Sequence, residues 1–435
     1  MEHEKLTVNS FFLQSSHEVS FYIRYFSSIT GYIYLASNFN KYYFIITDET
    51  ETTILSIKEN IDTHKTNPEF DKQNITFICS SDEQILWCHR YGFLTETQTF
   101  VDSQTIYSPT LLTEKSSWAY KDIARLCIFY KGESLQILHL EGLDHHWDIL
   151  PLLDNRTRCL VSWPCYFHKL LYEHNVNALY TQNPLFDRKN IVFLAPNLDG
   201  ILFSYEYGFH SILANQNCLI DYELFKIMDD GNVKAKYDMV MNCRPEMWKR
   251  PFLAEKVDNL AYIKGYNYGA EVYDYNKLHY MYTNDRRLEV SEIVLIYNQS
   301  SCGGIFSEKE GACYVSSEYL LCGLPVISTE SRGGRNTWYT KENSIIVEAD
   351  EDAVLEAVQV CMENVETGKM DRHQIRQTHI ETTNQMRERI IRCCQYMFDL
   401  SKIEMDARGH WRKTYFHTLL KTVPLHDAID LLRTK

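Results

Sequence analysis

One segment, residues 304–329, constrains the fold of this chain more than any other. A short β-rich run ends at Ser307, a loop follows, and residues 312–322 have the composition of a helix. Gly323 is placed to end that helix in the left-handed conformation, and Pro325 prevents its continuation. The next apolar run starts at once. The order strand, loop, helix, strand is typical of one unit of a parallel α/β sheet.

The same alternation runs along the whole chain of 435 residues. This length suits two α/β domains of roughly 200 residues each, with a boundary near residue 215. β-branched and aromatic runs predict strands at residues 31–36, 42–47, 75–79, 126–130, 158–163, 190–195, 238–243, 260–263, 304–307, 324–329 and 344–348. Helical patterns occupy residues 289–297, 312–322, 350–364, 374–400 and 410–422.

Charge and composition exclude several classes of partner. The formal net charge is −14, from 58 acidic and 44 basic residues, which disfavours nucleic acid and anionic membranes. No window of about 20 apolar residues suits a transmembrane helix, and the first residues lack a signal peptide's apolar stretch. Thirteen cysteines without a C-x-x-C pair are typical of reduced thiols. We therefore expect a cytoplasmic protein with no nucleic-acid partner and at most peripheral membrane contact.

The central segment has the chemistry of an anion site. A helix that follows a parallel strand points unpaired N–H groups at the ligand crevice, where they suit a diphosphate. Gly311 lets the backbone approach a ligand, and Glu310 lies at the mouth of the crevice. Glu318, about two turns into the helix, repels phosphate but can accept two hydrogen bonds from a vicinal diol such as a ribose.

A glycine turn and a basic pair extend this site. Gly333 and Gly334 follow the next strand, and their amides can ring an anion, with Arg335 as a forked donor. Arg244 and Lys249 follow the first strand of the second half and can neutralise a departing diphosphate. Each element alone also occurs as plain structure in α/β proteins, but their joint occurrence in this order favours a binding site.

These elements resemble glycosyltransferase family 4 of the GT-B superfamily, over about residues 217–365. The family's Glu-x7-Glu signature is similar to Glu310 and Glu318, and its small-Gly-x-Pro-Val ending to residues 322–326. Its Arg, followed five positions later by Lys, is similar to the basic pair. Its Asn-Asp-Phe entry to the second domain is similar to a sequence that begins at Asn217, with one additional residue.

The resemblance implies a GT-B fold, in which two Rossmann-like domains face each other across a cleft. Residues 1–214 would form the acceptor side, residues 215–404 would bind the donor, and a C-terminal helix at about 405–435 would cross back onto the first domain. The implied activity is a retaining, hexosyltransferase-like transfer from a nucleotide-diphosphate sugar, with UDP or GDP as the nucleotide. The acceptor would be a glycan, a lipid-linked sugar or another molecule, and neither a cofactor nor a metal is expected.

The resemblance also implies residue roles. Glu318 would hold the ribose and Glu310 a hydroxyl of the transferred sugar, while Arg244 and Lys249 would stabilise the leaving diphosphate. The other predicted donor-binding residues are Ser307, Gly311, Ala312, Gly333, Gly334 and Arg335. The family's Glu-Gly-Phe is Glu-Gly-Ala in this chain, so a small residue replaces an aromatic one.

The N-terminal half contributes weaker signals. His168 and His210 are candidates for the acceptor side, although each also fits a packed structural histidine. The cluster at residues 144–148 holds two adjacent histidines, which point to opposite faces in a strand and lack a partner at zinc spacing. We expect no metal site there.

Two alternative functions stay open at this point. A GT-B epimerase would convert the nucleotide sugar without an acceptor, and the sequence holds no additional acid/base cluster to support it. A non-catalytic sugar- or nucleotide-binding module would bind the nucleotide without turnover.

Overall fold

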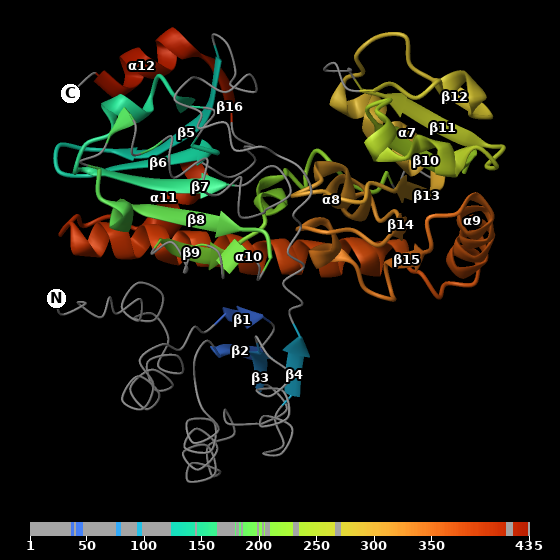
Figure 1. Cartoon of the computed structure of the whole chain (residues 1–435), viewed down its shortest axis with the longest axis horizontal. Coiled ribbons are helices and arrows are strands. Elements are labelled where there is room, and N and C mark those ends of the chain that lie inside the picture. The colour runs from blue at the N-terminus through green and yellow to red at the C-terminus, as the bar shows by residue number, and fades with distance from the viewer. Residues whose placement is uncertain are drawn as a thin grey trace. The chain divides into compact units, whose positions relative to one another are not determined.

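The computed structural model describes residues 36–38, 41–46, 75–79, 94–97, 123–143, 146–162, 179, 182–183, 186–197, 200–201, 204, 209–228, 235–265, 271–414 and 421–433. The chain divides into two compact units, Met1–Ser108 and Pro109–Lys435. The first unit holds a four-stranded sheet of β1 (Ala36–Asn38), β2 (Lys41–Ile46), β3 (Ile75–Cys79) and β4 (Leu94–Thr97). The last three of these strands are parallel (Figure 1).

The second unit contains two six-stranded sheets. The first sheet has the order β16-β5-β6-β7-β8-β9, and its strands are β5 (Ile123–Lys131), β6 (Gln136–Glu141), β7 (Thr157–Ser162), β8 (Ile191–Ala195), β9 (His210–Leu213) and β16 (Lys421–Pro424). The strands from β6 to β9 are parallel, whereas β5 and β16 are antiparallel to their neighbours. Parallel strands that are buried on both faces are typically continuous apolar runs, as β8 is.

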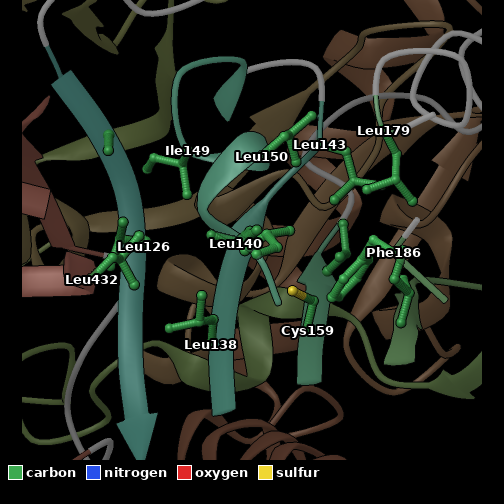
Figure 2. Packing of buried hydrophobic residues seen from close by; sticks show 14 of the residues in the cluster. Leu126, Leu138, Leu140, Leu143, Ile149, Leu150, Cys159, Leu179, Phe186 and Leu432 are labelled. Atoms are coloured by element: carbon green, nitrogen blue, oxygen red, sulfur yellow. The ribbon is translucent and has the colours of Figure 1, made fainter. Parts of the chain in front are cut away.

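The core of this sheet is rich in leucine (Figure 2). Leu126 of β5 packs in one cluster with Leu138 and Leu140 of β6 and Cys159 of β7. Leu432 of α12 (Leu425–Arg433) joins the same cluster from the far end of the chain. The C-terminal segment therefore belongs to the core of the first sheet.

The second sheet has the order β12-β11-β10-β13-β14-β15, and every pair in it is parallel. Its strands are β10 (Tyr237–Cys243), β11 (Leu260–Lys264), β12 (Tyr280–Thr283), β13 (Ser300–Ile305), β14 (Val326–Thr329) and β15 (Ser344–Val347). Counted along the chain this is the order 3-2-1-4-5-6, which defines the Rossmann fold. The α/β class predicted from sequence is confirmed.

Four helices accompany the second sheet: α7 (Val290–Asn298), α8 (Tyr314–Leu321), α9 (Glu351–Glu366) and α10 (Arg372–Leu400). The side chain of Asp350 accepts hydrogen bonds from two backbone N–H groups at the start of α9, as an N-cap does. Gly323 has a φ of +68°, which confirms the predicted left-handed end of α8. Within the described residues, no helix is long and apolar enough to cross a membrane.

The long helix α10 connects the two sheets of this unit, because it contacts β9 and α8 (Figure 1). Its arginines donate to backbone carbonyls at the end of β9 and in the segment that follows it. Arg389 donates to the Leu213 carbonyl at 2.8 Å, and Arg387 donates to the Ile220 carbonyl at the same distance. These bonds fix the entry to the second sheet.

The end of the chain departs from the prediction of a single helix over residues 410–422. It forms α11 (Ala407–Thr414), the edge strand β16 and then α12. Pro424 ends β16 at the sheet edge, where a missing N–H does not interrupt a ladder. The return of the C-terminal segment to the first sheet matches expectation. The predicted domain boundaries, which divide the chain into residues 1–214 and 215–404, remain a prediction.

Candidate functional site

The candidate site lies where the strand order of the second sheet reverses. The adjacent strands β10 and β13 are parallel, so their carboxyl ends open side by side. In open α/β sheets, the crevice at the carboxyl ends of the strands where the strand order reverses is the usual ligand position. Arg244 and Lys249 follow β10, and Ser307 and Glu310 follow β13. Both predicted groups therefore meet at one place.

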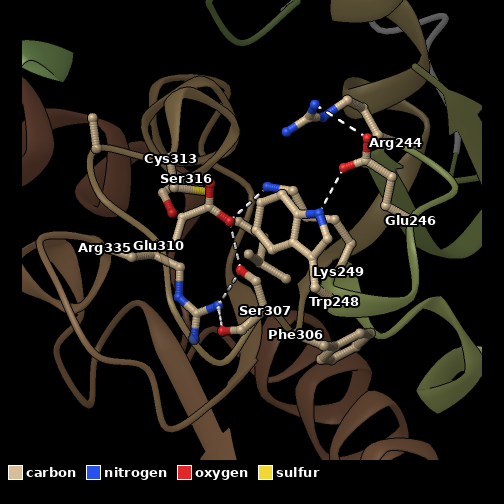
Figure 3. A network of polar contacts seen from close by, with 12 residues as sticks. Arg244, Glu246, Trp248, Lys249, Phe306, Ser307, Glu310, Cys313, Ser316 and Arg335 are labelled. Atoms are coloured by element: carbon tan, nitrogen blue, oxygen red, sulfur yellow. Dashed lines mark hydrogen bonds and ion pairs between the residues drawn. The ribbon is translucent and has the colours of Figure 1, made fainter. Parts of the chain in front are cut away.

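An ion pair joins the two loops (Figure 3). Lys249 Nζ lies 2.6 Å from Glu310 Oε2, and Ser307 Oγ donates to the same oxygen at 2.6 Å. The side chains of Lys249 and Glu310 are only 15% and 12% exposed, so the pair is screened weakly by solvent. Burial would raise the pKa of the Glu310 carboxyl, but Lys249 and Ser307 outweigh it and hold that pKa below its ordinary value. Glu310 is therefore ionised at neutral pH.

Arg335 supports this network through its hydrogen bonds to Ser307. It is fully buried, and its Nη1 donates to the Ser307 carbonyl at 2.7 Å and to Ser307 Oγ at 3.0 Å. Its Nη2 donates to the Thr329 carbonyl at 2.5 Å. The structure thus places the predicted phosphate donor as a brace between β14 and the loop after β13.

The loop after β10 holds two residues to which the sequence assigned no role. Glu246, 1% exposed, lies 3.2 Å from Arg244 Nη1 and accepts a 2.6 Å hydrogen bond from Trp248 Nε1. Lys249 Nζ lies 4.2 Å from the centre of the Trp248 ring. The sequence signal that could have found Glu246 and Trp248 is their position between the two predicted basic residues. They hold Arg244 in place, and also Lys249, which ends the short helix η6 (Met247–Lys249).

Glu318 lies on the face of α8 that approaches α7. Because Cys313 adopts a left-handed conformation with φ of 49°, α8 begins at Tyr314. Glu318 is therefore about one turn into the helix, not two as predicted. Tyr297 donates to Glu318 Oε2 at 2.8 Å. Burial raises the pKa of Glu318 to about 7, although the hydrogen bond from Tyr297 opposes the shift.

The loop before α8 is anchored to the segment that enters the second sheet. Asn217 is buried, and its Nδ2 donates to the carbonyls of Ala312 at 2.6 Å and Cys313 at 2.9 Å. Gly311 and Ala312 are themselves buried. Asn217 belongs to the entry motif noted in the sequence, but its contact with this loop could not be read there.

The glycine turn packs against the first sheet's loops. Asn215 Nδ2 donates to the Gly334 carbonyl at 3.0 Å. A Cβ at Gly334 would lie 2.4 Å from the Cβ of Pro196, so a larger residue would force these segments apart. Gly333 has a φ of +115°, which favours glycine. The turn thus fixes the distance between the two halves of this unit.

The structure describes only one of the two predicted acceptor-side histidines, His210. His168 lies outside the described residues. His210 is buried at the start of β9, where burial lowers its pKa despite the opposing charge of Asp187. It lies in the first sheet, whereas the Glu310 network is built from the second. Among the described residues, no three His, Cys, Asp or Glu side chains gather as metal ligands would.

Comparisons with known proteins show distant likeness. No family model matches the chain, and no curated protein matches it. The chain is similar to the structure of HepE from Anabaena in complex with UDP, at 11% identity and a TM-score of 0.42, covering 83% of this chain and 99% of that one. It is similar to sucrose-phosphate synthase from Thermosynechococcus elongatus, at 14% identity and a TM-score of 0.42, covering 61% and 73%. A glycosyltransferase from Rickettsia africae matches at 11% identity and a TM-score of 0.42, covering 82% and 99%.

Likeness at these identities and TM-scores supports no conclusion about chemistry.

Proposed function

We propose that this chain is a retaining GT-B glycosyltransferase, similar to family 4, that transfers a sugar from a nucleotide-diphosphate donor such as a UDP- or GDP-sugar. One observation supports this most: the ion pair of Lys249 and Glu310 lies at the switch point of a Rossmann sheet, beside the start of α8. A cation, a carboxylate and the start of a helix meet there, which are the groups that a sugar diphosphate requires.

In the proposed complex, different residues contact different parts of the sugar-nucleotide donor. Arg244 and Lys249 carry positive charge to the diphosphate, and the N–H groups at the start of α8 add partial positive charge. Glu318 accepts hydrogen bonds from the ribose hydroxyls. Glu310, ionised and fixed by Ser307, accepts one from a hydroxyl of the sugar.

The reaction breaks the bond between the sugar's anomeric carbon and the diphosphate oxygen and forms a bond to an acceptor oxygen. In the proposed mechanism the leaving phosphate takes the acceptor's proton, so no protein side chain is needed as a base. The rate then depends on stabilising the charge that develops on the diphosphate. Donor binding requires Lys249 to exchange its contact with Glu310 for one with phosphate, or to share it.

A panel of nucleotides tests donor binding. Thermal unfolding would be followed with UDP, GDP, ADP, CMP and their common sugars. At a hundredfold excess over Kd, one bound ligand stabilises the fold by about 2.7 kcal/mol, which raises the melting temperature by several degrees. We expect such a rise with one diphosphate and its loss in Glu318→Ala.

The matched control for this panel is Glu308→Ala. Glu308 is an exposed carboxylate in the same loop as Glu310 and pairs with Arg250, so its removal should leave the thermal shift intact. A chain that responds to no nucleotide would contradict the proposal. Product formed without any acceptor would identify an epimerase, and binding without turnover a non-catalytic module.

Donor affinity should increase with pH. Glu318 accepts hydrogen bonds from a diol through its ionised form, and its pKa is raised to about 7. The ionised fraction, and with it the affinity, therefore increases by about tenfold between pH 6 and pH 8. Calorimetric titration of the nucleotide at these two pH values measures this. Glu318→Gln removes the titrating carboxyl but leaves the ligand's own phosphate titration, so a variant with an unchanged pH profile would refute the role of Glu318.

A further inference from the structure

Two tyrosines pack edge to face beside Glu318, and one of them, Tyr297, donates a hydrogen bond to its carboxylate. Tyr297 of α7 and Tyr319 of α8 are fully buried, and their rings meet edge to face with centroids 4.8 Å apart. A Cβ at Gly303 of β13 would lie 2.3 Å from the Tyr319 ring, so this strand has no room for a larger residue. The rings are therefore held against the sheet by packing from three elements.

The hydrogen bonds of these tyrosines have a defined direction. Asn242, near the end of β10, donates through Nδ2 to Tyr297 Oη at 2.6 Å. The backbone N–H of Asn242 donates to Tyr319 Oη at 2.9 Å, and Tyr319 donates to the Val240 carbonyl at 3.1 Å. Since a tyrosine hydroxyl has one hydrogen, Tyr297 accepts from Asn242 and directs its own hydrogen to Glu318 Oε2. β10 thus fixes the orientation of the Tyr297 hydroxyl.

We propose that Tyr297, held by Asn242, is a positioning residue that fixes Glu318 Oε2 so that Oε1 is presented to the ribose hydroxyls of a nucleoside diphosphate. This inference rests on the proposed function. Without the tyrosine, the carboxylate would rotate freely about its last torsion, and the bound ribose would meet an acceptor of undefined direction. Tyr297 is held by a donor on one side and an acceptor on the other, so the direction of its hydrogen bond to Oε2 is fixed.

The ionisable groups that face Glu318 do not compete with it for a proton near neutral pH. Among the described residues, they are Tyr297 from α7, Tyr319 from α8 and Cys322, which directly follows α8. Burial raises the pKa of all three groups, so each is neutral at pH 7. Proton exchange at this site near pH 7 therefore reports Glu318 alone.

The first test needs no ligand. The carboxyl carbon of Glu318 would be titrated by 13C NMR in the full chain, with its signal assigned by its loss in Glu318→Gln. In Tyr297→Phe the ring packing stays, while the donated hydrogen that favours the ionised carboxylate is lost. We expect the titration midpoint to rise by about one pH unit, a tenfold change in proton affinity. Asn242→Ala, which releases Tyr297 but leaves its hydroxyl, should give a smaller rise in the same direction.

The matched control is Tyr273→Phe. Tyr273 donates to Glu255 Oε1 at 2.5 Å, so this variant removes the same kind of bond elsewhere in the same half of the unit. It should leave the Glu318 midpoint unchanged. A midpoint in Tyr297→Phe equal to that of the wild type would overturn the proposal whether or not the chain binds a nucleotide.

The second test uses the diphosphate identified by the thermal panel. A midpoint one unit higher lowers the ionised fraction at pH 7 from about one half to about one tenth, so Tyr297→Phe should bind about fivefold more weakly at pH 7. At pH 9 the carboxylate is largely ionised in both proteins, so the deficit that remains there measures the lost orientation of Oε1. Equal binding of the two proteins at pH 9 would mean that Tyr297 acts only on the pKa of the carboxyl and would overturn its positioning role. Failure of the wild type to bind any nucleotide would contradict the proposed function, and the carboxyl titration would still decide the role of Tyr297.

Discussion

Replacement of Lys249 by alanine is expected to lower the rate of sugar transfer by roughly 100- to 1000-fold, the loss typical when one donor to a developing oxyanion is removed. Lys249 is the cation that pairs with Glu310 at 2.6 Å between the loops after β10 and β13. Its charge is needed most when the diphosphate departs, because negative charge then accumulates on the leaving oxygen. The release of nucleoside diphosphate from the donor, followed with acceptor present, measures the effect.

Lys256→Ala is the matched control for this variant. Lys256 pairs with Asp352 at 2.7 Å, but both side chains are largely exposed, at 43% and 75%. An exposed pair of this kind contributes at most about 1 kcal/mol to stability, and its loss should leave turnover unchanged. Lys249→Arg, which keeps the charge, should retain part of the activity. Full turnover in Lys249→Ala would exclude the proposed stabilisation of the leaving group.

Arg335→Ala should cause the largest loss of stability, about 3–5 kcal/mol in the free energy of unfolding of the second unit. The substitution leaves a cavity and removes a charged hydrogen-bond donor from the carbonyls of Ser307 and Thr329. It also removes the group that holds Ser307 Oγ against Glu310. Urea unfolding followed by tryptophan fluorescence measures the change.

The comparison for this variant is Arg332→Ala. Arg332 precedes the same glycine turn, and it is exposed to solvent. Its removal should change the free energy of unfolding by no more than about 0.5 kcal/mol. If the two variants were equally stable, Arg335 would not be the brace that the hydrogen bonds describe.

Much of the second sheet could be predicted from sequence because its signals are short-range. The end of α8 follows from Gly323 and Pro325, whose backbone preferences act within a few residues. The strands follow from apolar runs that are continuous because both faces are buried. The start of α8 was predicted two residues early, since the left-handed Cys313 has no signature in its side chain.

The strand β16 could not be predicted for the opposite reason. It pairs with β5 across almost 300 residues of sequence, as the register of Lys421 with Leu126 shows. A proline such as Pro424 fits a strand only at a sheet edge, and the sequence does not reveal that β16 lies at one.

The sequence by itself determined which chemical groups are available: two carboxylates at Glu310 and Glu318, a basic pair, and a glycine turn in one order. These are local facts of side-chain chemistry and backbone freedom. Only the tertiary structure decided how the groups are used. The reversal of strand order brings Lys249 to Glu310 across 61 positions, buries Arg335 as a brace, and sets Tyr297 beside Glu318. Burial and partner choice depend on contacts between distant segments, and those contacts set the charge and orientation of each group.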